Sequence, residues 1–205
     1  MIMKNALLDT FNFRHACKLF DETRKIPQAD LDFILEAGRL SPSSMGLEHW
    51  KFIVVQTPQL KAEIQRACSD QPQISSSSDV IVIVAKKAEL QPDSDYVKAQ
   101  FNRLHLPPDK TEEFKQFYRE FVRKTDLTAW SIAQCHIAAA NMMTAAAAIG
   151  IDSCPIGAFE PEQVRVILKI DDAQYEVALV LPLGYRRHPQ PAKYRLPFSE
   201  LVEFR

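Results

Sequence analysis

The sequence has little of what marks the common redox and metal sites. Its four cysteines, Cys17, Cys68, Cys135 and Cys154, are scattered over 205 residues and form no CxxC pair. We therefore expect reduced thiols, as in cytoplasmic proteins, rather than a disulfide framework. The five histidines show no HExxH or other ligand spacing, so we expect no metal site.

Nucleotide and nucleophile motifs are also missing. No GxGxxG follows a predicted strand and no GxxxxGK[ST] is present, so neither a Rossmann dinucleotide site nor a P-loop is predicted. No GxSxG marks the nucleophile turn of a hydrolase. The usual nucleophilic and metal-dependent chemistries therefore have no recognisable position in this chain.

The chain further lacks a strong net charge and a long apolar run. Its formal net charge is -1, which gives no basic surface for nucleic acid or anionic membranes. Residues 1–13 have no apolar core of an export signal. The weakly polar stretch 137–151 is shorter than the roughly 20 residues of a membrane span. We expect a cytoplasmic protein that binds neither nucleic acid nor membrane.

Helical and strand patterns alternate along the chain. Apolar residues at helical spacing and short β-branched runs predict the elements. The expected helices cover 26–41, 58–68, 127–150 and 161–169, and the expected strands cover 50–56, 79–86, 153–157 and 175–185. The run 79–86 is apolar on both faces, which is typical of a central strand. The pattern predicts helices packed on one central sheet.

Residues 88–126 interrupt this alternation with a polar, charged stretch. Phe114, Phe117, Tyr118 and Phe121 recur within it at i, i+3, i+4 and i+7. This spacing predicts a two-helix excursion with one apolar face. No internal repeat or linker divides the chain, so we expect a single domain over residues 1–205.

Two short basic segments stand at opposite ends of the chain. Arg14 and Lys18 in "RHACK" share a side in a helix or a strand, and Lys193 and Arg195 in "KYR" share a side in an extended segment. An arginine guanidinium can donate two parallel hydrogen bonds to a phosphate, and a lysine ammonium adds a point charge. Taken singly, the Arg14 and Lys18 pair is equally compatible with solvated surface cations, and a pair such as Lys193 and Arg195 is usually a solubilising surface pair.

Two turns could present backbone groups to a ligand. "SPSSMG" ends in a tight polar turn at Gly46, and "SCPIGAF" carries Gly157 after a predicted strand. Glycine allows the backbone to approach a flat ring closely. Ordinary turn chemistry explains each segment as well.

The order of these segments resembles the nitroreductase family of FMN-dependent NAD(P)H oxidoreductases. The resemblance is carried by "RHACKLFD", "SPSSMGLEHWKFIVV", "IGIDSCPIGAF" and "KYRLP". It implies an α+β fold, a nitroreductase-like α-β-α sandwich whose mostly antiparallel sheet is flanked by helices. It also implies a homodimer across which the C-terminal tails are exchanged.

The resemblance assigns the residues around bound FMN. Arg14, Lys193 and Arg195 would hold the phosphate, and Lys18 would lie beside the N1/O2 edge of the ring. The other implied contacts are His15 and Ala16 along the ribityl chain, Pro42, Ser43, Ser44 and Gly46 from the partner subunit, and Pro155, Ile156, Gly157 and Ala158 against the ring. The N–H groups of Gly157 and Ala158 would point toward N5 and O4.

The chain departs from the family pattern in two places. Asp70, Gln71 and Gln73 stand where an asparagine near the flavin is frequent, so either Gln71 takes that contact or Asp70 points away. Glu48–His49 replaces a common Gln–Pro pair. Phe114 and Phe117 are the candidates for stacking on acceptors.

The implied activity is a ping-pong transfer of two electrons from NAD(P)H to nitroaromatic or quinone-like acceptors. Two other hypotheses stay open. One is a non-enzymatic dimer that stores or senses FMN, and the other is a flavin-free scaffold that keeps only the fold.

Overall fold

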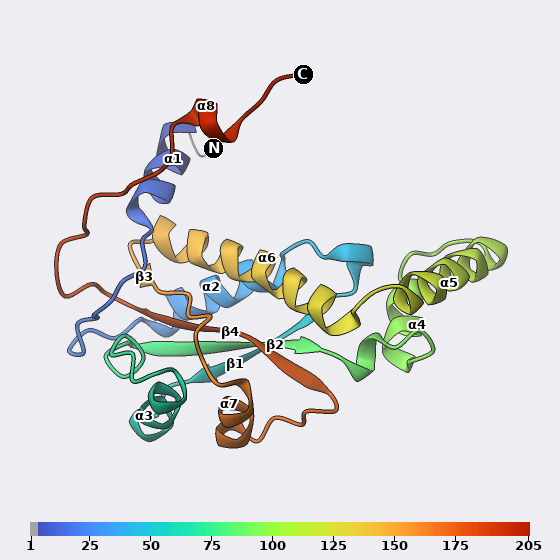
Figure 1. Cartoon of the computed structure of the whole chain (residues 1–205), viewed down its shortest axis with the longest axis horizontal. Coiled ribbons are helices and arrows are strands. Elements are labelled where there is room, and N and C mark those ends of the chain that lie inside the picture. The colour runs from blue at the N-terminus through green and yellow to red at the C-terminus, as the bar shows by residue number, and fades with distance from the viewer. Residues whose placement is uncertain (1–3) are drawn as a thin grey trace.

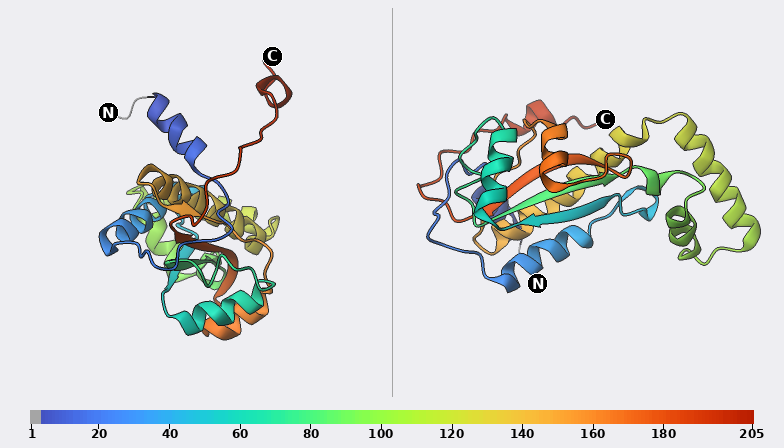
Figure 2. Two further views of the ribbon diagram at one scale, coloured as in Figure 1. Left: turned by 90° about the vertical axis from the view of Figure 1, so that its left-hand side faces the viewer. Right: turned by 90° about the horizontal axis from the view of Figure 1, so that it is seen from below.

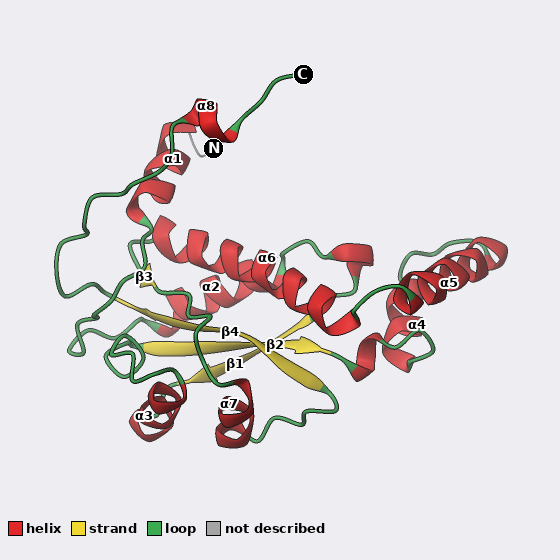
Figure 3. Ribbon diagram, in the orientation of Figure 1, coloured by secondary structure: helices red, strands yellow, loops and turns green. Residues whose placement is uncertain are grey.

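The computed structural model describes residues 4–205, which form an antiparallel sheet with helices on both faces (Figures 1 and 3). Within these residues the sheet has four strands in the order β1-β2-β4-β3. The strands are β1 (Trp50–Val55), β2 (Asp79–Lys86), β3 (Asp152–Ser153) and β4 (Tyr175–Gly184). All three pairings are antiparallel. The predicted α+β class is confirmed.

Helices cover each face of the sheet. Contacts place α2 (Gln28–Arg39) and α6 (Leu127–Ala148) on one face, and α3 (Pro58–Ala67) and α7 (Pro161–Leu168) cover the other (Figure 1). The side chains of β2 alternate between two cores, with Ile81 and Ile83 toward α2 and α6. Val80, Val82 and Val84 lie in the core with α3 and α7. This alternation explains why the sequence of β2 is apolar on both faces.

A glycine allows α2 and α6 to pack closely. A Cβ built on Gly38 would lie 2.8 Å from Sδ and 2.9 Å from Cγ of Met142. Any larger residue would require the Met142 side chain to shift. The opposite side of α6 is less covered, because Ile137 is 39% exposed. The helix is therefore not buried all round within one chain.

Several predicted boundaries differ from the structure, most by one or two residues, and three of the differences lie beside a proline. Helix α2 starts at Gln28 after Pro27 and ends at Arg39, before the residue that precedes Pro42. A residue before proline avoids the helical region. The predicted strand 153–157 is wrong in extent: β3 ends at Ser153, because Pro155 has no N–H for the ladder. Beyond it Ile156 forms only an isolated bridge with Val180.

The predicted excursion consists of two helices that extend from the end of β2 (Figure 1). They are α4 (Asp95–Asn102) and α5 (Pro108–Arg123), preceded by the short η2 (Ala88–Leu90). Tyr118 is buried and donates a hydrogen bond of 2.6 Å to the carbonyl of Leu90. Phe117 on the same helix is 56% exposed.

The two terminal segments project from the side of the molecule that carries α6 (Figures 1 and 2). No residue of α1 (Lys4–Phe13) is buried, and the tail after β4 ends with the short α8 (Phe198–Leu201). The large exposed apolar side chains of these segments are Leu7, Leu8, Phe11, Tyr194, Leu196, Phe198, Leu201, Val202 and Phe204. No helix in residues 4–205 has the length and apolarity that a membrane crossing requires.

Candidate functional site

The segment after α1 and the tail after β4 meet beside β3. The "RHACK" segment lies outside any helix, and Ala16 pairs with Ser153 in a parallel bridge. A cavity of about 250 Å³ opens between the two segments. Its walls are Arg14, His15 and Ala16 on one side and Gln190, Pro191, Ala192, Lys193, Tyr194 and Arg195 on the other. We call it the basic pocket; it brings together the three cations that the sequence assigns to a phosphate.

The basic pocket gathers like charges. Arg14 is half-buried, and burial followed by the charges of Arg14 and Arg195 lowers the pKa of Lys193. An anion would offset this mutual repulsion. Lys193 is also engaged locally, because its Nζ donates to the carbonyls of Phe11 (2.5 Å) and Arg14. It thus satisfies carbonyls at the C-terminal end of α1, a role the sequence did not indicate.

A buried carboxylate lies behind the basic pocket. Asp152 Oδ2 accepts hydrogen bonds from the backbone N–H (2.9 Å) and Nε (3.0 Å) of Arg186. Arg186 Nη2 lies 2.7 Å from Asp152 Oδ1, as an ion pair without hydrogen-bond alignment. His15 Nδ1 lies 3.5 Å from the same oxygen. Burial and Arg186 lower the pKa of His15, against the opposing effect of Asp152.

Sequence reasoning missed this cluster. Asp152 stands inside the recognised "IGIDSCPIGAF" segment, but Arg186 follows β4 in a stretch without a pattern. The two residues are 34 positions apart. The nearest signal was that Asp152 is the one charged residue in a segment that is otherwise apolar or small.

A second cavity of about 210 Å³ adjoins the basic pocket through shared residues. It is lined by His15, Ala16, Cys17, Lys18, Leu19, His188, Pro189 and Pro191. The exposed Lys18 reaches toward β3, with its Nζ 3.9 Å from Sγ of Cys154. The structure therefore brings Lys18 close to the loop that begins at Pro155.

The loop after Cys154 presents free backbone donors. Gly157 and Ala158 are exposed, and within residues 4–205 no hydrogen bond is formed by either N–H. Ile156 is buried and tied to Val180, which fixes the start of the loop. A Cβ built on Gly157 would meet no atom within 4 Å. The glycine therefore leaves open space where a flat ring could lie.

Gln71, one of the residues at the departure from the family pattern, braces this loop. Gln71 Nε2 donates to the carbonyl of Ala158 (3.2 Å), and Gln73 Nε2 donates to Gln71 Oε1 (2.7 Å). Asp70 is exposed on a turn with a φ of 54°. Of the two residues, Gln71 is the one that contacts the 155–158 loop, and its contact with a flavin stays a prediction.

The Pro42–Gly46 turn lines neither cavity of its own chain. Its 3-10 helix η1 (Ser44–Gly46) is anchored to the first half of α6, where Ser44 N–H donates to Gln134 Oε1 (2.9 Å). The expected role of Pro42, Ser43, Ser44 and Gly46 needs a partner subunit. The contact of this turn with the flavin therefore stays a prediction.

His49 lies beneath that turn. It is fully buried, its Nε2 lies 3.3 Å from the carbonyl of Ser44, and its ring packs edge-on against Trp130 at 4.4 Å. Burial lowers the pKa of His49 to about 4. The neutral ring thus fills the position where the family often has proline.

Phe114 and Phe117 lie at a separate hollow. With Leu106, Lys110 and Glu113 they line a cavity of about 380 Å³ on the excursion. The excursion lies at one end of α6, and α1 lies at the other end (Figure 1). Neither phenylalanine reaches the basic pocket of its own chain.

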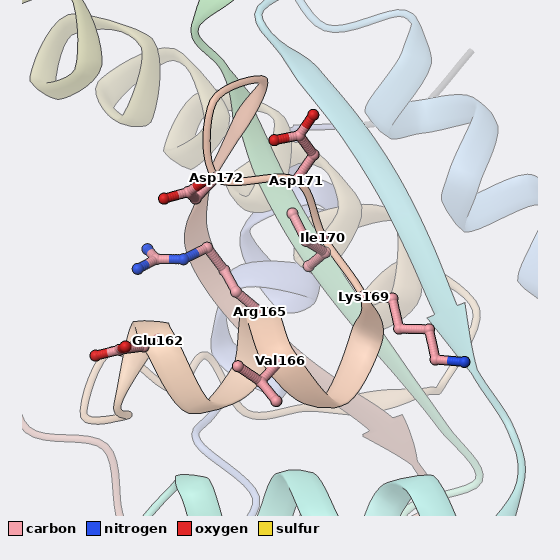
Figure 4. A pocket seen from close by; sticks show the side chains of 7 residues that line it. All are labelled: Glu162, Arg165, Val166, Lys169, Ile170, Asp171 and Asp172. Carbon is pink, nitrogen blue, oxygen red and sulfur yellow. The ribbon is translucent and has the colours of Figure 1, made fainter.

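A further hollow beside α7 has no convergent chemistry. The cavity of about 280 Å³ is lined by Glu162, Arg165, Val166, Lys169, Ile170, Asp171 and Asp172. Figure 4 shows that Glu162 and Lys169 point in opposite directions. Arg165 is paired with Glu176 at 2.6 Å. The charged groups do not surround a common point, so we do not regard this hollow as the functional site.

Comparisons with known proteins agree on one family. The profile of the Nitroreductase family matches residues 12–185. The chain is 37% identical to "Putative NAD(P)H nitroreductase YfkO" of Bacillus subtilis, with 98% of each sequence covered. It is 34% identical to "Putative NAD(P)H nitroreductase SH0546" of Staphylococcus haemolyticus, again over 98% of each.

Solved structures share the fold. "Putative nitroreductase ydfN" of Bacillus subtilis superposes with a TM-score of 0.87 at 26% identity, covering 99% of this chain and 100% of that one. A "putative nitroreductase in complex with FMN" from Exiguobacterium sibiricum gives 0.81 at 20% identity, covering 97% of each chain. Profile, relatives and fold together show that this chain belongs to the nitroreductase family.

Proposed function

We propose that this protein is an FMN-dependent oxidoreductase of the cytoplasm, which moves two electrons from NAD(P)H to nitroaromatic or quinone-like acceptors. The observation that carries the proposal is the convergence of Arg14, Lys193 and Arg195 on one pocket. Lys18 and the free N–H groups of the 155–158 loop adjoin it. Membership of the nitroreductase family and relatives named as NAD(P)H nitroreductases support the same activity.

The residues present fit FMN. A phosphomonoester carries about 1.5–2 negative charges at neutral pH, which matches a pocket lined by three cations. The open space in front of Gly157 suits a flat ring, and its N–H can donate to an acceptor atom of that ring. Bound FMN would supply the hydride chemistry between NAD(P)H and the acceptor.

The protein would contribute orientation and charge. Lys18 would place a cation beside the ring edge that gains negative charge on reduction. Such preorganised groups act without reorganising during the reaction, and loss of one typically costs about 100–1000-fold in rate. The Gly157 and Ala158 N–H groups would hold the ring in a fixed plane.

A homodimer would complete the site. The apolar side chains of α1 and the tail are unusually exposed for a chain that stays alone. In residues 4–205, β1 pairs only with β2, which leaves an open edge beside a cavity of about 460 Å³ formed with α2. An unprotected edge invites an added strand. The partner's tail would cover this edge, and the Pro42–Gly46 turn would reach the partner's flavin.

Absorbance spectroscopy tests the proposal. Purified protein should show flavin bands, which NAD(P)H should bleach without air and a nitro compound or quinone should restore. Initial rates at several donor and acceptor concentrations should give the parallel lines of a ping-pong cycle. Flavin bands that NAD(P)H leaves unchanged would indicate a storage or sensing dimer, and protein without flavin affinity would indicate a scaffold.

A further inference from the structure

We infer that Asp152 and Arg186 are positioning residues that hold the two walls of the basic pocket, although neither lines it. The inference rests on the proposed function, in which this pocket receives the phosphate of FMN. It concerns how the residues that contact the phosphate are held in position, and not which residues contact it.

Arg186 connects both walls to one point. Its Nη1 donates to Gln190 Oε1 (3.0 Å) in the tail, and its Nη2 donates to the carbonyl of Phe13 (3.4 Å). The guanidinium also lies over the Phe13 ring, 4.2 Å from its centroid. Gln190 in turn donates to the carbonyl of Asn12 (2.9 Å). One side chain thus joins the end of α1 to the tail.

Asp152 fixes the orientation of Arg186. The Asp152 side chain is 2% exposed, so its charge has little water to stabilise it. The paired nitrogens of a guanidinium match a carboxylate in a fixed plane, which a lysine cannot reproduce. A buried ion pair adds little net stability compared with apolar residues of similar size. Here the pair would instead fix geometry. It orients Arg186, which holds the carbonyl of Phe13, and Arg14 and His15 directly follow Phe13 along the chain.

His15 belongs to the same arrangement. Its buried Nδ1 faces Asp152 Oδ1 at 3.5 Å, while the ring lines both cavities. A carboxylate beside one ring nitrogen favours the proton on that nitrogen and leaves the other as an acceptor. Asp152 would therefore set the tautomer of His15 as well as the position of Arg186.

Two conservative variants test the inference, each with a matched control. Asp152→Asn and Arg186→Lys remove the paired geometry, whereas Glu176→Gln and Arg165→Lys alter the Arg165–Glu176 pair on the α7 side. The readout is the affinity of the flavin-free protein for FMN and for riboflavin, which lacks the phosphate. We expect both test variants to lose about 10-fold or more in FMN affinity, as when the supporting partner of a direct ligand is lost.

The ratio of FMN affinity to riboflavin affinity distinguishes a loss of phosphate positioning from a general loss of structure. Riboflavin affinity should stay near that of the unaltered protein, and the control variants should keep both affinities. An unchanged ratio of FMN to riboflavin affinity in both test variants would overturn the inference. In Asp152→Asn, ¹⁵N NMR should also show that the His15 tautomer shifts, and an unchanged tautomer would remove His15 from the arrangement.

Amide hydrogen exchange is the second measurement, for the case in which one variant does not fold or the protein binds no flavin. Arg186→Lys keeps the buried charge paired and is expected to fold even where Asp152→Asn does not. If the unaltered protein binds neither flavin, the proposed function fails, and inorganic phosphate becomes the probe. Phosphate should then slow exchange of the amides of residues 14–17 in the unaltered protein and not in Arg186→Lys. Equal slowing in both proteins, or none in either, would contradict the inference.

Discussion

The Nζ of Lys18 lies 3.9 Å from the Sγ of Cys154, the residue that immediately precedes the exposed loop 155–158. The parallel bridge between Ala16 and Ser153 holds the two segments side by side. The Lys18 ammonium is thereby kept close to the start of a loop with two backbone N–H groups that have no partner in residues 4–205. This neighbourhood combines positive charge with hydrogen-bond donors, as reduction of a flavin ring requires.

Lys18→Ala tests the role of that charge. Loss of the cation should destabilise the anionic reduced flavin, so the two-electron potential should fall and the reductive rate should drop by about 100–1000-fold. FMN retention should change little, because the phosphate contacts remain. Spectroscopic redox titration gives the potential, and Lys18→Arg should restore most of it. An unchanged potential in Lys18→Ala would exclude the N1/O2 role.

Arg14→Ala and Arg195→Ala test the phosphate assignment. Each removes one charged hydrogen-bond donor, which corresponds to about 1.5–3 kcal/mol of binding free energy. Titration of the flavin-free proteins with FMN measures the loss. Arg187→Ala is the control, since Arg187 is exposed nearby but lines neither cavity. If both test variants purify with full flavin, the assignment is wrong.

Deletion of residues 196–205 tests the dimer. This segment carries the exposed Leu196, Phe198, Leu201 and Phe204, and it leaves Lys193 and Arg195 in place. We expect the full chain to be a dimer and the shortened chain to dissociate at micromolar concentration, as measured by light scattering after size-exclusion chromatography. A monomeric full chain with complete flavin content would contradict tail exchange.

His49 predicts a loss of stability in mild acid. Its pKa falls from 6.5 to about 4 on burial, so folding favours the neutral ring. The contribution to stability is therefore complete above pH 6.5 and is lost as the pH falls toward 4, at about 1.4 kcal/mol for each pH unit. Urea unfolding at pH 7 and pH 5 measures it.

The matched variants for this prediction are His49→Gln and His188→Gln. His49→Gln should show a smaller difference between the two pH values, with a remainder from His15, whose pKa is also lowered. His188 is exposed, so His188→Gln should behave like the unaltered protein. The same pH dependence in all three proteins would show that His49 is not the responsible group.

Much of the fold could be predicted from the local pattern of apolar residues. The residues of β2 alternate between two apolar cores, and that alternation is readable because each face of a strand repeats every second residue. Two helices in the excursion were predicted from its apolar spacing; Phe114, Tyr118 and Phe121 lie in one hydrophobic cluster, whereas Phe117 is 56% exposed. Phosphate-binding candidates at the two ends of the chain could be proposed because charge pairs and their spacing are local properties.

The arrangement of those candidates depends on contacts between distant parts of the chain. Lys193 lies on the carbonyls of Phe11 and Arg14, and Arg186 pairs with Asp152 across 34 residues of sequence. A periodic pattern records which side chains are buried, but it does not record which distant polar group satisfies another. The elements and the charges of the site could therefore be predicted from local sequence, whereas its geometry depends on how α1, β3 and the tail pack together.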